Sequence, residues 1–418
     1  MEENLENLMQ SDLLSLDEAI NKIKSNFQKI GNEDIFLKDA LGRCLAKPII
    51  SDVDNPKYDV SSMDGYAINY KDYFDVRDDK IKKFKVVGES SAGHPYSKKI
   101  NSLEAVRIFT GAKLPKGSNT VIIQENTKVS KSGDYIIIDE NPEKNQFVRK
   151  KGLDFKKNNI LFKEGTILKS RHLGSIAMTG QAWLTVSRQP IVSILSTGNE
   201  ILKVGEQLSK DKIPSGNSLM LASMVQEFGG KARILPVAKD NIRDIYEILE
   251  NALDSDLIIT TGGVSVGKYD LIQKALSKFE NKIEFWKIAM RPGKPLLFSK
   301  INNTPLIGLP GNPVSSGVCS LIFVNIAIRK MLGDNSHFPI LEYGFLKGKM
   351  SKNDKRLDFV RANLNYKNGV LNVTPLNLQD SSMITNFSRA DCLIIRNPFE
   401  KQVNNGEKVK ILKFPNNI

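Results

Sequence analysis

Cysteine and histidine are both scarce in this chain of 418 residues, which contains three of each. The cysteines lie far apart, at Cys44, Cys319 and Cys392, without the paired spacing typical of metal ligands. The sequence therefore predicts neither a zinc site nor a disulfide framework, and it fits a reducing cytoplasm. The histidines match no site motif, so we expect structural or solvent-exposed roles for all of them: His94, His172 and His337.

Long apolar runs and a signal peptide are missing as well. The first 20 residues, MEENLENLMQSDLLSLDEAI, are acidic and amphipathic, unlike the basic and apolar start of a secreted protein. The longest apolar helix candidate, VCSLIFVNIAI at 318–328, is expected to be too short and too polar to span a bilayer. These features predict a soluble protein with no membrane partner.

Positive charge is in excess, since the formal net charge is +13. Such an excess favours anionic ligands or partners. The lysines, however, are scattered through the chain together with many asparagines and form no basic block. A nucleic-acid partner is therefore the weaker interpretation, and we expect none.

The length is sufficient for several domains, and the pattern changes along the chain. Residues 1–50 and 146–186 show helical spacing and are expected to form one helical linker domain. Its first helix contains Leu16, Ile20, Ile23 and Phe27, with Ser15 and Glu18 at capping-box spacing. Between them, short alternating runs separated by Gly, Pro and Asn predict an inserted β-rich domain at 51–145.

Strand and helix patterns alternate from 187 to 337, with helices expected near 218–228 and 241–253. Apolar strands alternating with helices favour a doubly wound, mainly parallel sheet. Residues 338–418 show short strands without helical period, which indicates a small β-barrel or sandwich. The fold class predicted overall is multidomain α/β plus β.

Polar loops follow the predicted strands of the sheet: STGNE at 196–200, AKDN at 238–241 and TTGGVSVGKYD at 260–270. Ligands of doubly wound sheets bind at the carboxyl ends of the strands, where these loops would emerge. GGVSVGK at 262–268 also satisfies the first part of a P-loop pattern, but Tyr269 replaces the Ser or Thr that binds magnesium. Asp270 then either caps a helix after a plain glycine turn or helps to hold Mg²⁺ at an anion site.

Two further turns contain groups that suit an anion. Lys287, Arg291 and Lys294 lie within eight residues between apolar runs, and they form either an oxyanion clamp or three ordinary surface charges. In LPGNPVS, Asn312 is expected to cap a helix that begins at Pro313, which would leave backbone amides free for an anion.

Together with DVSSMDGYA at 59–67, IFTGAKLPKG at 108–117 and RLDFVRANL at 356–364, these segments resemble the molybdopterin molybdenumtransferase family of the bacterial MoeA type, which is similar to the gephyrin E domain. The resemblance follows the same order along nearly the whole chain. It implies an L-shaped protomer of four domains that forms a homodimer. The implied reaction inserts molybdenum from molybdate into adenylylated molybdopterin with Mg²⁺ and releases AMP. Transient contact with a molybdopterin adenylyltransferase or with recipient molybdoenzymes would follow from that role.

This reaction suits the residues present, because molybdate is a dianion and the other substrate contains a pyrophosphate. Binding both together requires dense positive charge, and carboxylate-bound Mg²⁺ would neutralise charge as AMP leaves. No nucleophilic Ser or Cys is required.

The resemblance also implies roles for individual residues. Asp64 and Thr110 would face the cleft of the partner subunit, and Asp240 and Asp270 would bind Mg²⁺. The implied catalytic residues are Asp64, Thr110, Glu200, Asp240, Asp270, Lys287 and Arg291. The implied substrate-binding residues are Gly262, Gly263, Ser265, Lys294, Pro310, Gly311, Asn312, Arg361 and Ser381.

Structural roles are the alternative for several of these residues. Asp64 and Thr110 would then only close turns, and Arg361 would pair with Asp358 on a strand surface. Likewise, Glu200 would be a carboxylate at the start of a helix, Asp240 a helix cap and Ser381 a loop hydroxyl.

The chain departs from the family pattern at four positions. Asn199 and Ser215 stand where acids are common, Arg291 where a Lys is common, and Leu153 where a glutamate is often found. Fewer carboxylates would weaken metal binding and leave metal stoichiometry open. Two other hypotheses therefore remain: a molybdopterin-binding carrier or scaffold with weak turnover, and a phosphotransferase built on GGVSVGK.

Overall fold

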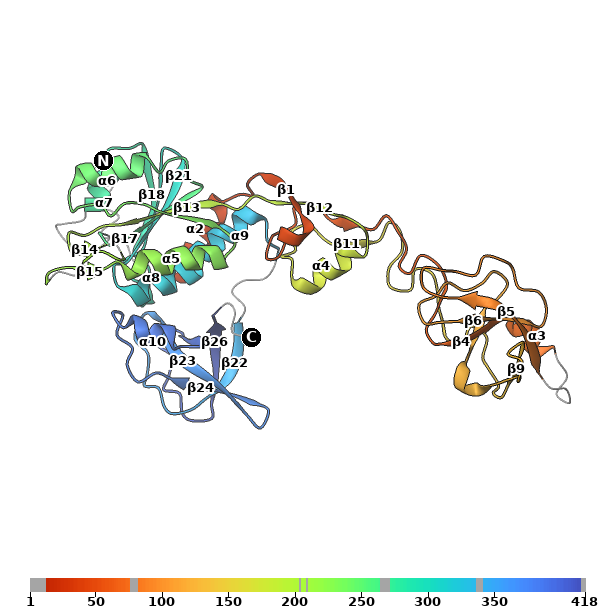
Figure 1. Ribbon diagram of the computed structural model, residues 1–418. Coiled ribbons are helices and arrows are strands. Elements are labelled where there is room, and N and C mark those ends of the chain that lie inside the picture. Colours follow the sequence, from red (N-terminus) through yellow and green to blue (C-terminus); the bar gives the residue numbers. More distant parts are fainter. Residues whose placement is uncertain are drawn as a thin grey trace.

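The computed structural model describes residues 13–75, 82–202, 204–207, 210–263, 271–335 and 341–414. Figure 1 shows an elongated, bent chain in which an α/β sheet domain and a small β-barrel lie side by side at one end. A linker unit occupies the middle, and a β-rich unit lies at the other end. This architecture confirms the predicted fold class.

The sheet domain contains six strands in the order β16-β13-β17-β21-β20-β18. The first four are parallel, whereas β20 is antiparallel to both of its neighbours. The strands are β13 (Ile191–Ser196), β16 (Lys231–Ile234), β17 (Leu257–Thr261), β18 (Asn281–Trp286), β20 (Leu297–Ile301) and β21 (Thr304–Leu309). Parallel pairing places the carboxyl ends of β13, β17 and β21 at one edge, where their loops form a shared surface.

Helices cover both faces of this sheet. Ile259 and Ile307 pack into one core, whereas their neighbours Ile258 and Leu306 pack into a second core on the opposite face. The first face is covered by α5 (Gly216–Glu227), α8 (Pro313–Cys319), the π-helical segment η3 (Ser320–Val324) and α9 (Asn325–Leu332). The second is covered by α6 (Ile242–Glu250) and α7 (Leu271–Leu276). Alternation of side chains along the strands thus produces a doubly wound domain.

The apolar helix of this domain is longer than the sequence predicted. Residues Pro313–Leu332 form 20 residues of continuous helix, long and apolar enough by composition to cross a membrane. The expectation that the segment is too short was therefore wrong. However, 89% of its most apolar window is buried inside the protein, where it packs against the sheet. It serves as the core helix of the domain.

The first helix, α2 (Leu16–Asn26), begins with the predicted capping box: the amide of Ser15 donates to Oε2 of Glu18 at 3.0 Å. Its side chains Ala19 and Ile23, together with Phe27 directly after it, are buried in the same core as α9. This helix therefore packs with the sheet domain and not with the linker. The local pattern identified an amphipathic helix, but it could not identify the surface that the helix covers.

The linker contains fewer helical residues than the spacing over 146–186 predicted. Only α4 (Ser170–Ala177) is an α-helix there, and it packs with short strands and a 3-10 turn in a small core of its own. These elements are β1 (Asn32–Phe36), η1 (Leu37–Asp39), β2 (Ile49–Ile50), β11 (Ile160–Phe162) and β12 (Trp183–Ser187). Short strand pairs leave little alternating pattern, which explains the wrong prediction.

The β-rich unit is a six-stranded sheet in the order β7-β4-β6-β5-β9-β8. Its strands are β4 (Gly65–Ile68), β5 (Lys83–Ser90), β6 (Glu104–Ile108), β7 (Thr120–Ile123), β8 (Thr127–Val129) and β9 (Tyr135–Ile138). At its margin lie β3 (Val60–Ser61), α3 (Tyr70–Phe74), η2 (Gln124–Asn126) and β10 (Val148–Arg149). Because β4 is antiparallel to β6 and β7, Asp64 lies at the same end of the sheet as Thr110 and Gln124.

The C-terminal unit is a closed barrel, since β23 pairs with both β24 and β25. Its strands are β22 (Leu341–Leu346), β23 (Leu357–Lys367), β24 (Val370–Pro375), β25 (Cys392–Arg396) and β26 (Lys408–Lys413), with one short helix, α10 (Ile384–Ser388). The short strand β19 (Met290–Arg291) extends from the sheet domain and pairs in parallel with β23. This pairing joins the barrel directly to the cation-rich turn.

All three cysteines are free and buried. Burial raises the pKa of Cys44 to about 11 and that of Cys392 to about 12, and it also raises the pKa of Cys319. We expect the native thiols to react with a disulfide reagent at least about 100-fold more slowly than those of the denatured chain. A colorimetric thiol assay with and without denaturant measures this difference, and rapid reaction of any native thiol would contradict it.

Candidate functional site

A cleft of about 910 Å³ lies between the carboxyl edge of the sheet and the barrel. Thr197, Gly262 and Gly311 enter it from the loops after β13, β17 and β21, whereas Phe359 and Arg361 enter it from β23. The cleft therefore occupies the edge at which doubly wound sheets bind their ligands.

One wall of the cleft contains the carboxylates of Glu200 and Asp240. Oδ2 of Asp240 accepts the backbone N–H of Asn199 at 3.0 Å, and the backbone N–H of Asp240 donates to Oδ1 of Asn199 at 3.2 Å. This reciprocal pair joins the loops after β13 and β16. Asn199 thus fixes the position of Asp240, although its neutral amide contributes no charge to the wall.

The turn after β17 requires glycine. Gly262 and Gly263 have φ values of +89° and +68°. A Cβ atom at Gly263 would lie 2.7 Å from Cγ1 of Ile272, and one at Gly262 would lie 3.0 Å from the carbonyl oxygen of Thr197. The turn therefore brings its backbone directly to the cleft. Ser265 and Asp270 lie outside the described residues, as does most of GGVSVGK.

The turn after β21 differs from its predicted form. Asn312 occupies the N-cap position of α8, but its side chain makes no capping hydrogen bond. Instead, its Nδ2 donates to Oγ of Ser381 at 2.9 Å, and the amide of Val314 donates to the carbonyl oxygen of Ser381 at 3.1 Å. Pro313 has no N–H, and the N–H of Val314 is already bonded to Ser381. The expectation of free amides at the start of this helix is therefore wrong for its first two residues.

The cation-rich turn is held by aspartates from the barrel. Nη1 of Arg291 lies 3.0 Å from Asp354, and Nη2 pairs with Asp358. The hydrogen bond to Asp358 raises the pKa of Arg291, and a hydrogen bond from the Arg356 amide lowers that of Asp354. Arg291 lines the cleft with its charge compensated by two carboxylates. Lys294 also lines the cleft, and it forms no ion pair with any other described residue.

Lys287 does not line the cleft. It adopts a φ of +71°, and its Nζ lies 4.4 Å from the centre of the Trp286 ring. The chain turns at this residue immediately after β18, so the ammonium group contacts the aromatic face while the following turn continues to the cleft. The structure therefore separates Lys287 from Arg291 and Lys294, with which the sequence grouped it.

Arg361 is almost completely buried, with 2% of its surface exposed, and it lines the cleft from β23. Its guanidinium group donates to Oε1 of Gln379 at 3.1 Å and to the carbonyl oxygen of Asp380 at 2.9 Å. Burial lowers its pKa. Since Asp358 pairs with Arg291, the alternative that Arg361 pairs with Asp358 on an open surface is wrong.

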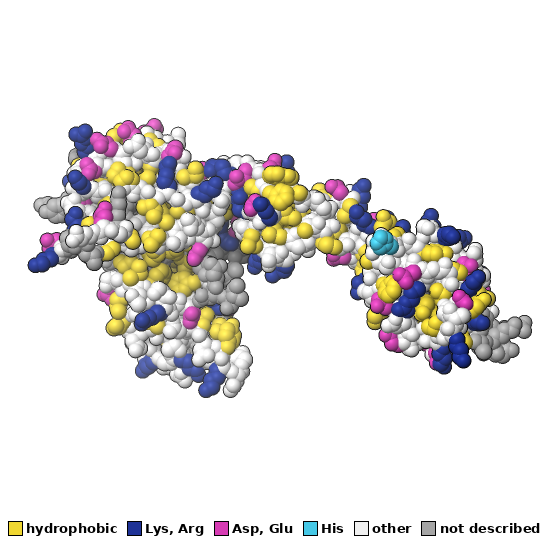
Figure 2. All heavy atoms as spheres, in the orientation of Figure 1, with side chains coloured by type: hydrophobic (Ala, Val, Ile, Leu, Met, Phe, Trp, Pro, Cys, Tyr) yellow, Lys and Arg dark blue, Asp and Glu magenta, His cyan; other side chains and the backbone are white. Residues whose placement is uncertain are grey.

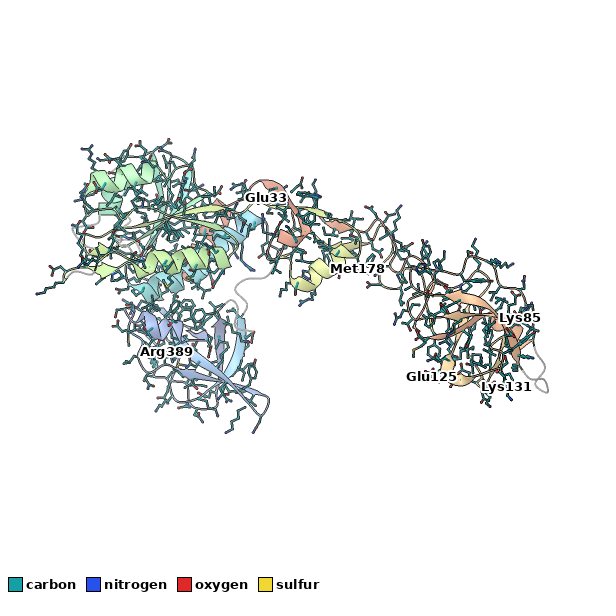
Figure 3. The ribbon with its side chains drawn as sticks, viewed as in Figure 1. Glu33, Lys85, Glu125, Lys131, Met178 and Arg389 are labelled. Carbon is teal, nitrogen blue, oxygen red and sulfur yellow. The ribbon has the colours of Figure 1, made fainter. Side chains whose placement is uncertain are left out.

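Asp64 and Thr110 contact each other in the β-rich unit. Oδ1 of Asp64 accepts the amide N–H of Thr110 at 2.7 Å and its hydroxyl at 2.8 Å, and these bonds lower the pKa of Asp64. Figure 3 labels Glu125 in this unit, at the opposite end of the molecule from Arg389 of the barrel. The pair closes a turn, and it cannot reach the cleft of its own chain.

A second pocket of about 520 Å³ adjoins the cleft and shares Thr197, Glu200 and Gly311 with it. Its other walls include β14 (Ile201–Leu202) and β15 (Ile213–Pro214). Ser215 lines it and has a buried hydroxyl 2.6 Å from that of Ser218. Ser215, which stands where the family pattern commonly has an acid, is thus part of a neutral hydroxyl cluster beside a pocket with both apolar and polar walls.

The cleft brings together eleven of the residues proposed from the sequence: Glu200, Asp240, Gly262, Gly263, Arg291, Lys294, Pro310, Gly311, Asn312, Arg361 and Ser381. Their roles stay predictions. Sequence reasoning did not single out several other residues that line the cleft: Thr197, Ser315, Arg356, Gln379 and Asp380. Arg356 begins the RLDFVRANL segment, and Gln379 and Asp380 immediately precede Ser381, so the same motifs contained the signal.

The described residues include no group of three or more His, Cys, Asp or Glu side chains able to hold a metal ion. Mg²⁺, however, usually binds through one or two carboxylates together with water and substrate phosphates. Glu200 and Asp240, on one wall of one cleft, fit that mode.

Three family models match the chain: the MoeA N-terminal region (domain I and II) at 14–180, a probable molybdopterin binding domain at 193–330, and the MoeA C-terminal region (domain IV) at 344–414. The molybdopterin molybdenumtransferase of Haemophilus influenzae is 33% identical over 96% of this chain and 99% of its own length. That of Bacillus subtilis is 30% identical over 96% and 94%. A crystal structure of the molybdopterin biosynthesis MoeA protein from Pyrococcus horikoshii superposes with a TM-score of 0.83 at 26% identity, covering 96% of this chain and 100% of that one.

Proposed function

Because the chain belongs to the molybdopterin molybdenumtransferase family of MoeA proteins, we propose that it inserts molybdenum from molybdate into adenylylated molybdopterin, with Mg²⁺, and releases AMP. The enzyme class, a molybdopterin molybdotransferase, follows from family membership. The adenylylated substrate, Mg²⁺ and the release of AMP are specific to this proposal.

The observation that carries the proposal is the separation of charge across one cleft. Glu200 and Asp240 occupy the sheet side, whereas Lys294 and Arg361 occupy the side of the cation-rich turn and the barrel. The carboxylates on that second side, Asp358 and Asp380, are bonded to Arg291 and Ser382. A pyrophosphate bound between them would meet carboxylates suited to Mg²⁺ on one side and cations on the other. The adjoining pocket offers room for the ring system of the same substrate.

The chain's own residues would act by binding and orientation. Lys294 and Arg361 would hold the molybdate oxyanion near the dithiolene sulfurs, and the glycine turn after β17 would bring backbone amides to the pyrophosphate. Glu200 and Asp240 would hold Mg²⁺, which supplies neutralisation of the phosphate oxygens when bound. The interaction of Asn199 with Asp240 would keep that carboxylate oriented.

A homodimer is part of the proposal, because Asp64 and Thr110 require a second copy to approach a cleft. The linker has exposed apolar side chains suited to such an interface: Trp183 is 65% exposed and packs edge-on against Phe36, and Met178 is 59% exposed. Figure 2 shows hydrophobic side chains gathered on this unit, and Figure 3 labels Met178 there. Burial of this surface would stabilise an isologous contact between linkers.

The proposed location is the cytoplasm, where free thiols and a labile dithiolene substrate remain reduced. The substrate would be received from a molybdopterin adenylyltransferase, and the product would pass to recipient molybdoenzymes. Transient contact with these proteins accords with this sequence of steps.

The test is AMP release from adenylylated molybdopterin by the purified protein with Mg²⁺, with and without molybdate. The product is also offered to a cofactor-free molybdoenzyme. We expect molybdate-dependent AMP release together with activation of the acceptor enzyme. Substrate binding without AMP release would contradict the proposal and support the carrier alternative, which the neutral residues Asn199 and Ser215 favour.

A further inference from the structure

Arg361 differs from the other buried arginine of the barrel in how its charge is held. Arg361 and Arg396 are the two buried arginines among the described residues, with 2% and 4% of their surfaces exposed. Nε of Arg396 pairs with the carboxylate of Glu400 at 2.9 Å. Within the described part of the chain, Arg361 forms no ion pair. A buried guanidinium group without a carboxylate is unusual, because removing a charge from water is costly.

Gln379 takes the place of a carboxylate partner at Arg361, with hydrogen bonds from its neutral side-chain amide. Its Oε1 accepts both the amide N–H of Arg361, at 3.0 Å, and Nε, at 3.1 Å. Its Nε2 donates to the carbonyl oxygens of Arg361, at 3.0 Å, and of Leu376, at 2.8 Å. The side-chain amide of Gln379 thus bonds to Arg361 through both its oxygen and its nitrogen, and its nitrogen also bonds to the adjoining loop. This amide adds no charge.

The remaining partners of the Arg361 guanidinium group are also neutral. Nη1 donates to the carbonyl oxygen of Asp380 at 2.9 Å, and Nη2 donates to that of Leu378 at 3.4 Å. The carboxylate of Asp380 accepts the amide and hydroxyl of Ser382 instead, at 2.8 and 2.6 Å. It is therefore a nearby negative charge that makes no hydrogen bond to the guanidinium group.

We propose that Gln379 is a positioning residue that holds Arg361 through neutral hydrogen bonds in place of a paired carboxylate, so that Arg361 supplies a fixed positive charge to the anionic substrates. Arg291 contrasts with it, because two aspartates compensate its charge. The inference rests on the proposed function, since it assumes an anionic substrate in this cleft. The hydrogen bonds of Gln379 also attach the 376–381 loop to β23, and the same loop places Ser381 against Asn312 and Val314 at the start of α8.

The experiment separates charge from packing with two variants of the full-length protein. Gln379→Glu adds a negative charge beside Arg361, whereas Gln379→Met removes the hydrogen bonds without adding charge. Calorimetry measures the binding of molybdate and, separately, of inorganic pyrophosphate at several salt concentrations. Thermal unfolding monitors the fold of each variant, and Gln402→Glu, an exposed residue of the same barrel, is the control for net charge.

We expect Gln379→Glu to weaken anion binding by about 10-fold and to make it less dependent on salt. Gln379→Met is expected to weaken binding by about 3-fold with an unchanged salt dependence, and Gln402→Glu to match the wild type. Unchanged affinity in folded Gln379→Glu overturns the charge role, and unchanged affinity in Gln379→Met overturns the positioning role. Equal losses with equal salt dependence reduce Gln379 to a packing residue.

This result is independent of the enzymatic assay. If the wild type releases AMP with molybdate while both variants bind anions normally, this inference fails and the proposed function stands. If the wild type binds neither anion and releases no AMP, the proposed function itself fails.

Discussion

The Asp240→Asn enzyme is expected to release AMP in the presence of molybdate about 100- to 1,000-fold more slowly than the wild type. An asparagine retains a side-chain oxygen that can accept the N–H of Asn199, so the contact between the two loops survives. The substitution removes one of the two carboxylates of this wall and leaves Glu200 in place. The measurement is kcat at increasing Mg²⁺, and a higher Mg²⁺ requirement should accompany the lower rate.

Asp244→Asn is the matched control for this variant. Asp244 belongs to the first turn of α6, four residues further along the chain, and it does not line the cleft. The same loss of charge there should leave AMP release within about 2-fold of the wild type. Unfolding midpoints should stay within about 2 °C for Asp240→Asn. A folded Asp240→Asn enzyme with normal activity would remove Asp240 from the metal site.

Complementation between subunits is the second large effect that we expect. Asp64→Asn and Lys294→Ala homodimers should each lose on the order of 100-fold in activity. In the proposed homodimer, a hybrid that contains one chain of each kind would have one cleft with an intact Lys294 that faces the partner's intact Asp64. Such hybrids, isolated with two different affinity tags, should recover about half of the wild-type rate, because one of two equivalent sites is whole.

The control is a hybrid of Asp240→Asn with Lys294→Ala. Asp240 and Lys294 both line the cleft of their own chain. Each of the two clefts in this hybrid therefore contains one defect, and no recovery is expected. Recovery in both hybrids would show that activity does not depend on shared sites. Absence of recovery in the Asp64 hybrid would mean that Asp64 only closes its turn with Thr110, as its hydrogen bonds permit.

Local sequence determined the types of the sheet domain, the β-rich unit and the barrel, and one side of the candidate site. Apolar strands that alternate with helices predict a parallel sheet, and parallel strands place their carboxyl ends on one edge. For that reason the order of strands and loops along the chain was sufficient to assign the motifs STGNE, AKDN and TTGGVSVGKYD to one surface, and the cleft contains residues from all three of them. The cleft also contains Pro310, Gly311 and Asn312 of the LPGNPVS turn. The closed barrel also followed in outline from short strands without helical period.

Tertiary structure alone decided how the charges are paired and which surfaces each element covers. Arg291 is compensated by Asp354 and Asp358, more than 60 residues away, because β19 pairs with β23. Lys287 is turned onto Trp286, and α2 packs in the core of the sheet domain. Asp64 directly precedes β4, whose unit lies at the opposite end of the molecule from the sheet domain and the barrel (Figure 1). Periodicity and motifs report on neighbours along the chain, whereas the compensation of a charge depends on groups that only the folded chain brings together. Arg361 shows the difference most directly: its sequence motif predicted a cation at the site, but only the contacts of Gln379 reveal that the charge is buried and held by neutral groups.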